Sequence, residues 1–205
     1  MTRRPRTLRN PSFRNPTFFS TWLLWLVGVV AFPIAGIAGT AFGGRLSNPV
    51  SALIGGAACG IIIGLGQVLV SRRRLDPLMW IPLSAIGMGL GLLLGSSVVN
   101  YRTTLAELAL MGAITGLVFG AAQALALPPR ARGRWLWALG VAALWALGWT
   151  VTALFGSNVD EQFTNFGIVG AVTFTALSGL LLHFLLPFHP ASGMWLRSRP
   201  VGPRS

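Results

Sequence analysis

Six long apolar stretches alternate with short polar segments along the chain of 205 residues. Each stretch is longer than the roughly 20 residues that a helix needs to cross a hydrocarbon layer of about 30 Å. The stretches cover residues 18–42, 47–71, 77–99, 104–127, 135–156 and 164–188. We therefore predict an all-α polytopic membrane protein with six transmembrane helices, built from three helical hairpins over 18–71, 77–127 and 135–188.

The arginines divide the polar segments into two groups. Only Arg45 and Arg102 lie in the connections after the first and third stretches. The other fourteen lie in residues 1–17, 72–74, 130–134 and 189–205. Basic residues beside transmembrane helices are found mainly on the cytoplasmic side. We therefore expect a multi-pass protein of the bacterial plasma (cytoplasmic) membrane, with the N-terminus and the C-terminus both in the cytoplasm.

The composition excludes the water-soluble class. Charged residues make up 10% of the chain, against about 25% in soluble domains, and the mean hydropathy is +0.68. The net charge of +12 lies in short arginine segments beside apolar stretches, an arrangement that fits anionic lipid headgroups better than nucleic acid. We expect the basic tails 1–17 and 189–205 to lie against such lipids. The partners expected are the lipid bilayer and possible membrane proteins, with no nucleic acid.

Two stretches that lie 56 residues apart carry the same glycine motif. Residues 56–67 read GAACGIIIGLGQ, and residues 112–123 read GAITGLVFGAAQ. At about 100° per residue, the three glycines of each copy share one helix face, with the glutamine in its middle. A stripe of small residues lets another helix backbone come close within lipid. We therefore predict helix packing at Gly56, Gly60, Gly64, Gly112, Gly116 and Gly120.

The repetition extends to the other spans. A tryptophan precedes a glycine by eleven residues in each odd-numbered span, which adds Gly36, Gly91 and Gly148 to the predicted packing positions. The sixth span is a degraded copy of the glycine motif, with Leu182 in the place of the glutamine. Successive copies enter the membrane in the same direction. We therefore predict parallel repeats around an axis along the membrane normal.

Repeated hairpins of the form G-x3-G-x2-Q, each followed by a basic loop and a tryptophan, resemble those of uncharacterised multi-span bacterial membrane proteins. The resemblance extends over residues 21–187 and implies no activity to transfer. In size and topology the chain also looks like the substrate-binding subunits of energy-coupling-factor vitamin transporters.

Three polar side chains fall at a similar depth near the cytoplasmic ends of their spans: Gln67, Gln123 and His183. One interpretation is a polar ring around the repeat axis that holds a ligand headgroup or a cofactor. The other is hydrogen bonding between helices, which contributes about 0.6 kcal/mol on average in membrane proteins. A haem ligated by His183 would lack a second axial imidazole at this depth. Cys59 is the single cysteine and no Cys/His cluster is present, so we expect no metal and no cofactor.

The opposite side of the membrane carries an outer polar cluster, which comprises Arg45, Arg102, Glu107, Asp160 and Glu161. Ion pairs across this side are expected to contribute about 0–1 kcal/mol each. Glu107 points about 180° away from the glycine stripe of its own helix, which argues against a proton-coupling role.

The tryptophans suggest a further division. Six of them lie near the cytoplasmic interface, where an aromatic belt accounts for them: Trp22, Trp25, Trp80, Trp135, Trp137 and Trp195. Trp145 and Trp149 lie deeper in the fifth span, where they either pack against neighbouring helices or line a pocket. We favour packing.

We predict no enzyme. Ser178 and His183 faintly resemble the motif of rhomboid intramembrane proteases, but they point about 140° apart on one helix, whereas a Ser–His dyad needs hydrogen-bond reach. The expected function is a structural or accessory subunit that packs with membrane partners. The alternative is a small-molecule or lipid carrier, or a substrate-binding component of a transporter. A binding component should have a closed pocket lined by polar groups, whereas a packing subunit should have occupied glycine faces and a large apolar flank.

Overall fold

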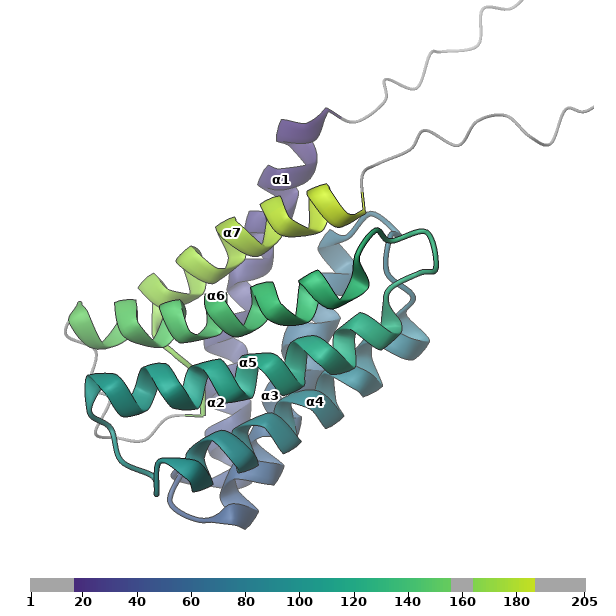
Figure 1. Cartoon of the computed structure of the whole chain (residues 1–205). Coiled ribbons are helices and arrows are strands. Elements are labelled where there is room, and N and C mark those ends of the chain that lie inside the picture. Colours follow the sequence, from purple (N-terminus) through teal and green to yellow (C-terminus); the bar gives the residue numbers. More distant parts are fainter. Residues whose placement is uncertain (1–16, 156–163, 187–205) are drawn as a thin grey trace, which may run out of the picture.

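A computed structural model describes residues 17–155 and 164–186, and this part of the chain is all-helical, without strands (Figure 1). Six helical segments are long and apolar enough to cross a membrane, with mean hydropathies of 1.5 to 2.1. The first of these segments, Phe18–Gly43, comprises three consecutive helical elements. The predicted fold class, an all-α protein of six spans, is therefore confirmed. The elements are α1 (Phe18–Val27), η1 (Gly28–Val30), α2 (Ala31–Gly43), α3 (Pro49–Val70), α4 (Pro77–Val98), α5 (Leu105–Ala126), α6 (Arg134–Leu154) and α7 (Ile168–Leu185).

The first span is interrupted, although the sequence predicts one continuous helix. A short 3-10 turn, η1, separates α1 from α2. Pro33 follows within the first turn of α2, and its ring has no N–H to donate to the carbonyl of Val29, four residues earlier. The interruption therefore lies where the proline weakens the helix.

Local sequence explains where the helices begin. Asn48 and Ser51 form a capping box at the start of α3, and Thr104 and Glu107 form one at the start of α5. The Asp76 carboxylate accepts the backbone N–H of Leu78 at the start of α4. Such caps satisfy backbone donors that have no partner within the helix. They place each helix start directly after a short connection.

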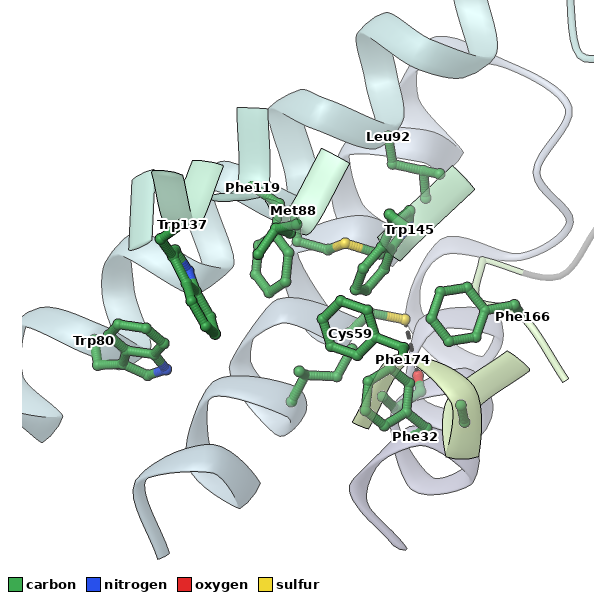
Figure 2. Packing of buried hydrophobic residues seen from close by; sticks show 14 of the residues in the cluster. Phe32, Cys59, Trp80, Met88, Leu92, Phe119, Trp137, Trp145, Phe166 and Phe174 are labelled. Carbon is green, nitrogen blue, oxygen red and sulfur yellow. Dashed lines mark hydrogen bonds between the residues drawn. The ribbon is translucent and has the colours of Figure 1, made fainter. Parts of the chain in front are cut away.

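The six spans form a closed ring, in which each packs against the next along the chain and α7 returns to α1 and α2 (Figure 1). The centre of this ring of helices is filled by aromatic side chains from distant parts of the sequence (Figure 2). The Trp145 ring lies 5.1 Å from that of Phe119, 4.7 Å from that of Phe166 and 5.0 Å from that of Phe174. Trp145 is therefore a packing residue at the centre of the protein.

The glycine stripes of α3 and α5 each pack against the following helix. A Cβ on Gly116 would lie 2.7 Å from the carbonyl oxygen of Val141 and 2.9 Å from Cα of Ala142, both on α6. A Cβ on Gly56 would lie 2.8 Å from the carbonyl oxygen of Met88 on α4. These backbones approach each other so closely that any side chain at the glycine positions would overlap with a neighbour.

The other predicted packing glycines differ among themselves. Gly91 faces the backbone of Thr115 on α5, and Gly148 faces the ring of Phe166. Gly36 is an exception, because a Cβ there would meet no atom within 4 Å. The prediction of a packing contact at Gly36 is therefore wrong. Gly36 instead lines a pocket between α2 and α7.

Candidate functional site

The two glutamines of the repeated motif meet inside the bundle. The side-chain nitrogen Nε2 of Gln123 donates a hydrogen bond to Oε1 of Gln67 over 2.9 Å. Both side chains are buried, with 5% of Gln67 and 0% of Gln123 exposed. The expectation that these two amides converge is confirmed.

Each glutamine also accepts a hydrogen bond from a tryptophan of the next predicted hairpin. Nε1 of Trp80 donates to Oε1 of Gln67 over 2.9 Å, and Nε1 of Trp137 donates to Oε1 of Gln123 over 3.1 Å. The amide of Gln123 donates in addition to Oγ of Ser84 over 2.9 Å. These five residues, which we call the glutamine cluster, link four helices. Because Gln123 uses both its N–H donors and its oxygen, the hydrogen bonds of its amide are all made within the protein.

The same contacts correct the prediction of an aromatic belt. Trp25, Trp80 and Trp137 are at most 2% exposed, so they lie inside the bundle and not at its surface. A buried indole N–H needs an acceptor, and the partners on α3, α5 and α7 supply one. Trp135 is 62% exposed and fits the predicted belt, and Trp195 lies outside the described residues.

The third place in the predicted ring is taken by Ser178. Nε1 of Trp25 donates to Oγ of Ser178 over 3.1 Å, and this hydroxyl donates to the carbonyl of Thr175 over 3.2 Å. His183 instead packs edge-on against Phe18, with ring centroids 4.5 Å apart. Its Nδ1 is buried without a hydrogen-bond partner among the described residues. The prediction that His183 completes the ring is therefore wrong.

Helix geometry explains this exchange. Ser178 lies four residues, or about one turn, before Leu182, the counterpart of the glutamines, and so shares its face. His183 follows Leu182 and points about 100° away. A sequence signal for the missed partners exists, because Trp25, Trp80 and Trp137 recur at nearly the same spacing as the glutamines.

The cavity beside the glutamine cluster has a volume of about 10 Å³. Its walls include Gln67, Thr175 and Ser178. This volume is close to the minimum that holds a single water molecule. The geometry therefore favours the structural interpretation of Gln67 and Gln123, in which they join helices.

A larger cavity, the α2–α7 pocket, lies at the opposite end of the bundle and has a volume of about 730 Å³. It is lined by Phe32, Pro33, Gly36, Ile37, Thr40, Ala41, Trp149, Thr152, Asn165, Phe166, Gly167, Ile168 and Ala171. The polar groups of Asn165 and Thr152 are engaged by the backbone of Phe32, Phe166 and Gly167. The pocket is thus mainly apolar, which suits a hydrophobic ligand.

A third cavity, which we call the arginine pocket, lies where α3 leads into α4 and α5 leads into α6. It measures about 430 Å³ and is lined by Arg73, Arg74, Leu75, Asp76, Met79, Leu125, Ala126, Leu127, Pro128, Pro129, Arg130 and Arg134. Arg74 is only 7% exposed. Burial, together with the charge of Arg72, lowers the pKa of the Arg74 guanidinium.

The outer polar cluster is only partly described. Nε of Arg102 forms an ion pair with Oε1 of Glu107 over 2.6 Å. The other oxygen, Oε2, accepts hydrogen bonds from the backbone and hydroxyl groups of Thr104. Glu107 therefore serves as a helix cap at the start of α5. Arg45 lies between α2 and α3, and Asp160 and Glu161 lie outside the described residues.

No group of three or more His, Cys, Asp or Glu side chains with the arrangement of a metal site occurs among the described residues. Cys59 is buried, and its thiol donates to the carbonyl of Ala35 over 3.0 Å. No protein-family model matches the chain, and no curated protein or solved structure matches it either.

Proposed function

We propose that this membrane protein is a non-enzymatic structural or accessory subunit that packs with membrane partners. The observation that carries the proposal is the glutamine cluster, whose amides bind tryptophans and each other. The cavity that Gln67 borders holds only about 10 Å³. The glycine faces of α3 and α5 are likewise occupied by neighbouring helices of the same chain. Both features stabilise one rigid arrangement of the spans.

The lipid-facing surface supports a role within the bilayer. Large apolar side chains are exposed on spans all around the ring, among them Ile37, Leu69, Leu78, Leu139 and Phe184. In lipid such residues need no further cover. A partner subunit would therefore bind through one sector of this surface and leave the other sectors to lipid.

Photo-crosslinking in intact membranes tests this proposal. A photoreactive amino acid is placed singly at the exposed positions Ile37, Leu69, Leu78 and Phe184, with buried Phe119 as the control. We expect protein adducts from neighbouring positions on one side of the bundle and none from Phe119. Lipid adducts alone at every exposed position would contradict an accessory subunit.

The proposed orientation has its own test. In our proposal both termini and the arginine pocket are cytoplasmic. Fourteen of the sixteen arginines lie in the two tails and in the segments 72–74 and 130–134, and basic residues beside transmembrane helices are found mainly on the cytoplasmic side. A cysteine at Arg102, whose side chain is 67% exposed, should react with an impermeant thiol reagent added outside intact cells. A cysteine at Arg132 should react only after the membrane is opened. External labelling at Arg132 would reverse the orientation.

The α2–α7 pocket favours a second candidate function, a carrier or substrate-binding component for an apolar small molecule or lipid. Its volume of about 730 Å³ falls within the usual range of ligand pockets, about 300–1,000 Å³. Trp149 lines it and has a buried Nε1 without a hydrogen-bond partner among the described residues.

The variant Gly36→Phe separates the two candidates. A side chain at Gly36 enters open space, so the fold should survive while the pocket fills. Ile34→Phe, on the same helix but outside the pocket lining, is the matched control. Mass spectrometry of molecules extracted from the purified protein should show a compound lost only in Gly36→Phe if the pocket binds a ligand. Identical extracts from both variants would leave the accessory subunit as the better candidate.

A further inference from the structure

The arginine pocket concentrates positive charge with little compensation. Four guanidinium groups line it, from Arg73, Arg74, Arg130 and Arg134, and Asp76 supplies the only lining carboxylate in the described part of the chain. One oxygen of Asp76 accepts the backbone N–H of Leu78. The ion pair between Arg102 and Glu107 lies at the other end of the bundle, so it does not offset the charge of the pocket. The pocket therefore has a surplus of positive charge.

Two of the four arginines are fixed in place by backbone carbonyls. Arg74 donates from Nε to Ser71 and from Nη1 to Leu186, over 3.0 and 3.5 Å. Arg134 donates from Nε to Ala124 over 2.9 Å and from Nη2 to Leu125 over 2.6 Å. These carbonyls lie near the C-terminal ends of helices, where the helix dipole favours a cation. The two side chains thus form a positively charged floor.

Arg73 and Arg130 form the accessible part of the pocket. Both are exposed, and neither side chain has a hydrogen bond or ion pair within the described part of the chain. Arg72 and Arg73 adopt positive φ angles of 52° and 61°, and this left-handed turn separates Arg73, which lines the pocket, from Arg72, which does not. Free guanidinium groups of this kind bind phosphate through paired hydrogen bonds.

The remaining wall of the pocket is apolar. Met79 and Leu125 are 49% and 57% exposed, and both belong to helices that are long and apolar enough to cross a membrane. The ligand that matches a basic mouth next to a lipid-facing apolar wall is itself amphipathic. An inorganic phosphate ion would match the arginines but leave this wall without a partner.

We propose that the arginine pocket binds the phosphate headgroup of an anionic membrane phospholipid, with an acyl chain along Met79 and Leu125. Arg73 and Arg130 contact the phosphate directly, and Arg74 and Arg134 supply the positive field beneath it. Basic pockets between transmembrane helices bind anionic headgroups on this physical basis. The site is distinct from both the glutamine cluster and the α2–α7 pocket. The proposal of a lipid site does not depend on which of the two candidate functions is correct.

The chain offers a matched pair of variants for the test. The double substitution Arg73→Gln with Arg130→Gln removes two charges from the pocket lining. The double substitution Arg72→Gln with Arg132→Gln removes two charges from the same two loops, but from exposed residues outside the lining. Because the side chains of Arg73 and Arg130 make no hydrogen bonds within the described residues, the lining variant should fold.

Binding is measured on the delipidated full-length protein in detergent, by native mass spectrometry during titration with phosphatidylglycerol. Phosphatidylcholine with the same acyl chains, and inorganic phosphate as a competitor, provide the other two arms. We expect the lining variant to bind phosphatidylglycerol about tenfold more weakly than the unaltered protein, and the control variant to change by less than about twofold. Phosphatidylcholine should bind more weakly than phosphatidylglycerol.

Three results would overturn the proposal. Equal weakening in both variants would mean that the loops attract anionic lipid only through general charge. Equal binding of the two lipids would show that the apolar wall acts alone. Displacement of phosphatidylglycerol by a similar concentration of inorganic phosphate would identify a site for the free ion. Thermal unfolding and gel filtration of each variant confirm that a loss of binding is not a loss of fold, and if the double variant unfolds, Arg73→Gln alone replaces it.

Discussion

The α5–α6 interface and the α7–α1 interface occupy equivalent positions in the predicted repeat, but they are built differently. In the first, Gly116 approaches the backbone of Val141, and Gln123 accepts a hydrogen bond from the indole N–H of Trp137. In the second, Gly179 faces the rings of Trp22 and Trp25. Here Ser178 accepts a hydrogen bond from the indole N–H of Trp25. The indole-to-acceptor contact is kept, while backbone contact is replaced by side-chain contact.

This difference shows where neighbouring spans of the ring pack tightly and where they leave space between them. Backbone contact brings α5 and α6 together along their length, because no side chain separates them. Bulky rings hold α7 away from α1, and the α2–α7 pocket lies farther along this same junction. A degraded glycine stripe thus accompanies the part of the ring that has room for a ligand.

The largest expected effect comes from Gly116→Leu. A side chain at this position would overlap with backbone atoms of α6, and overpacking of this kind costs about 1–3 kcal/mol of unfolding free energy. Thermal and denaturant-induced unfolding in detergent measure the loss. Gly36→Leu, which places the same side chain in open space, is the control and should be close to neutral. Equal stability of Gly116→Leu and the unaltered protein would contradict the described α5–α6 interface.

Gln123→Leu should have a somewhat smaller effect. It removes hydrogen bonds to Gln67, Ser84 and Trp137 at once, and it leaves a buried indole N–H without a partner. We expect a loss of about 1–2 kcal/mol of unfolding free energy, near the upper end of values for single contacts in membranes. A double-mutant cycle with Gln67→Leu should give a non-zero coupling energy. Strict additivity would contradict a direct bond between the amides.

The smallest effect is expected for Ser178→Ala at the α7–α1 interface. This change removes one acceptor for Trp25, and a single contact of this type contributes about 0.6 kcal/mol in membrane proteins. His183→Ala, one turn further along but outside the contact, tests the corrected assignment in the same unfolding assay. If coupling to Trp25→Phe is found for His183→Ala and not for Ser178→Ala, the structural placement of Ser178 is wrong.

Much of the fold can be predicted from apolar length and spacing. Six stretches of sufficient length predict six spans, and the glycine spacing predicts which face of α3 and α5 packs closely. The break between α1 and α2 is harder to predict, because Pro33 near a helix start is compatible with either a kink or a continuous helix. The mistaken belt assignment has a similar origin: Trp25, Trp80 and Trp137 lie at the depth of a belt, and depth alone does not distinguish the lipid side from the interior.

The amino-acid pattern alone is enough to predict the number of spans, the glycine faces and the clustering of arginines between alternate spans, because these depend on composition and on the angle between successive residues of one helix. The packing of the helices in three dimensions shows three further features: Gln67 and Gln123 are hydrogen-bonded to each other, Ser178 lies where His183 was expected, and Gly36 lines a pocket. Each of these depends on how far neighbouring helices are rotated and separated. That rotation and separation follow from closure of the whole ring, which brings residues as distant as Trp25 and Ser178 into contact.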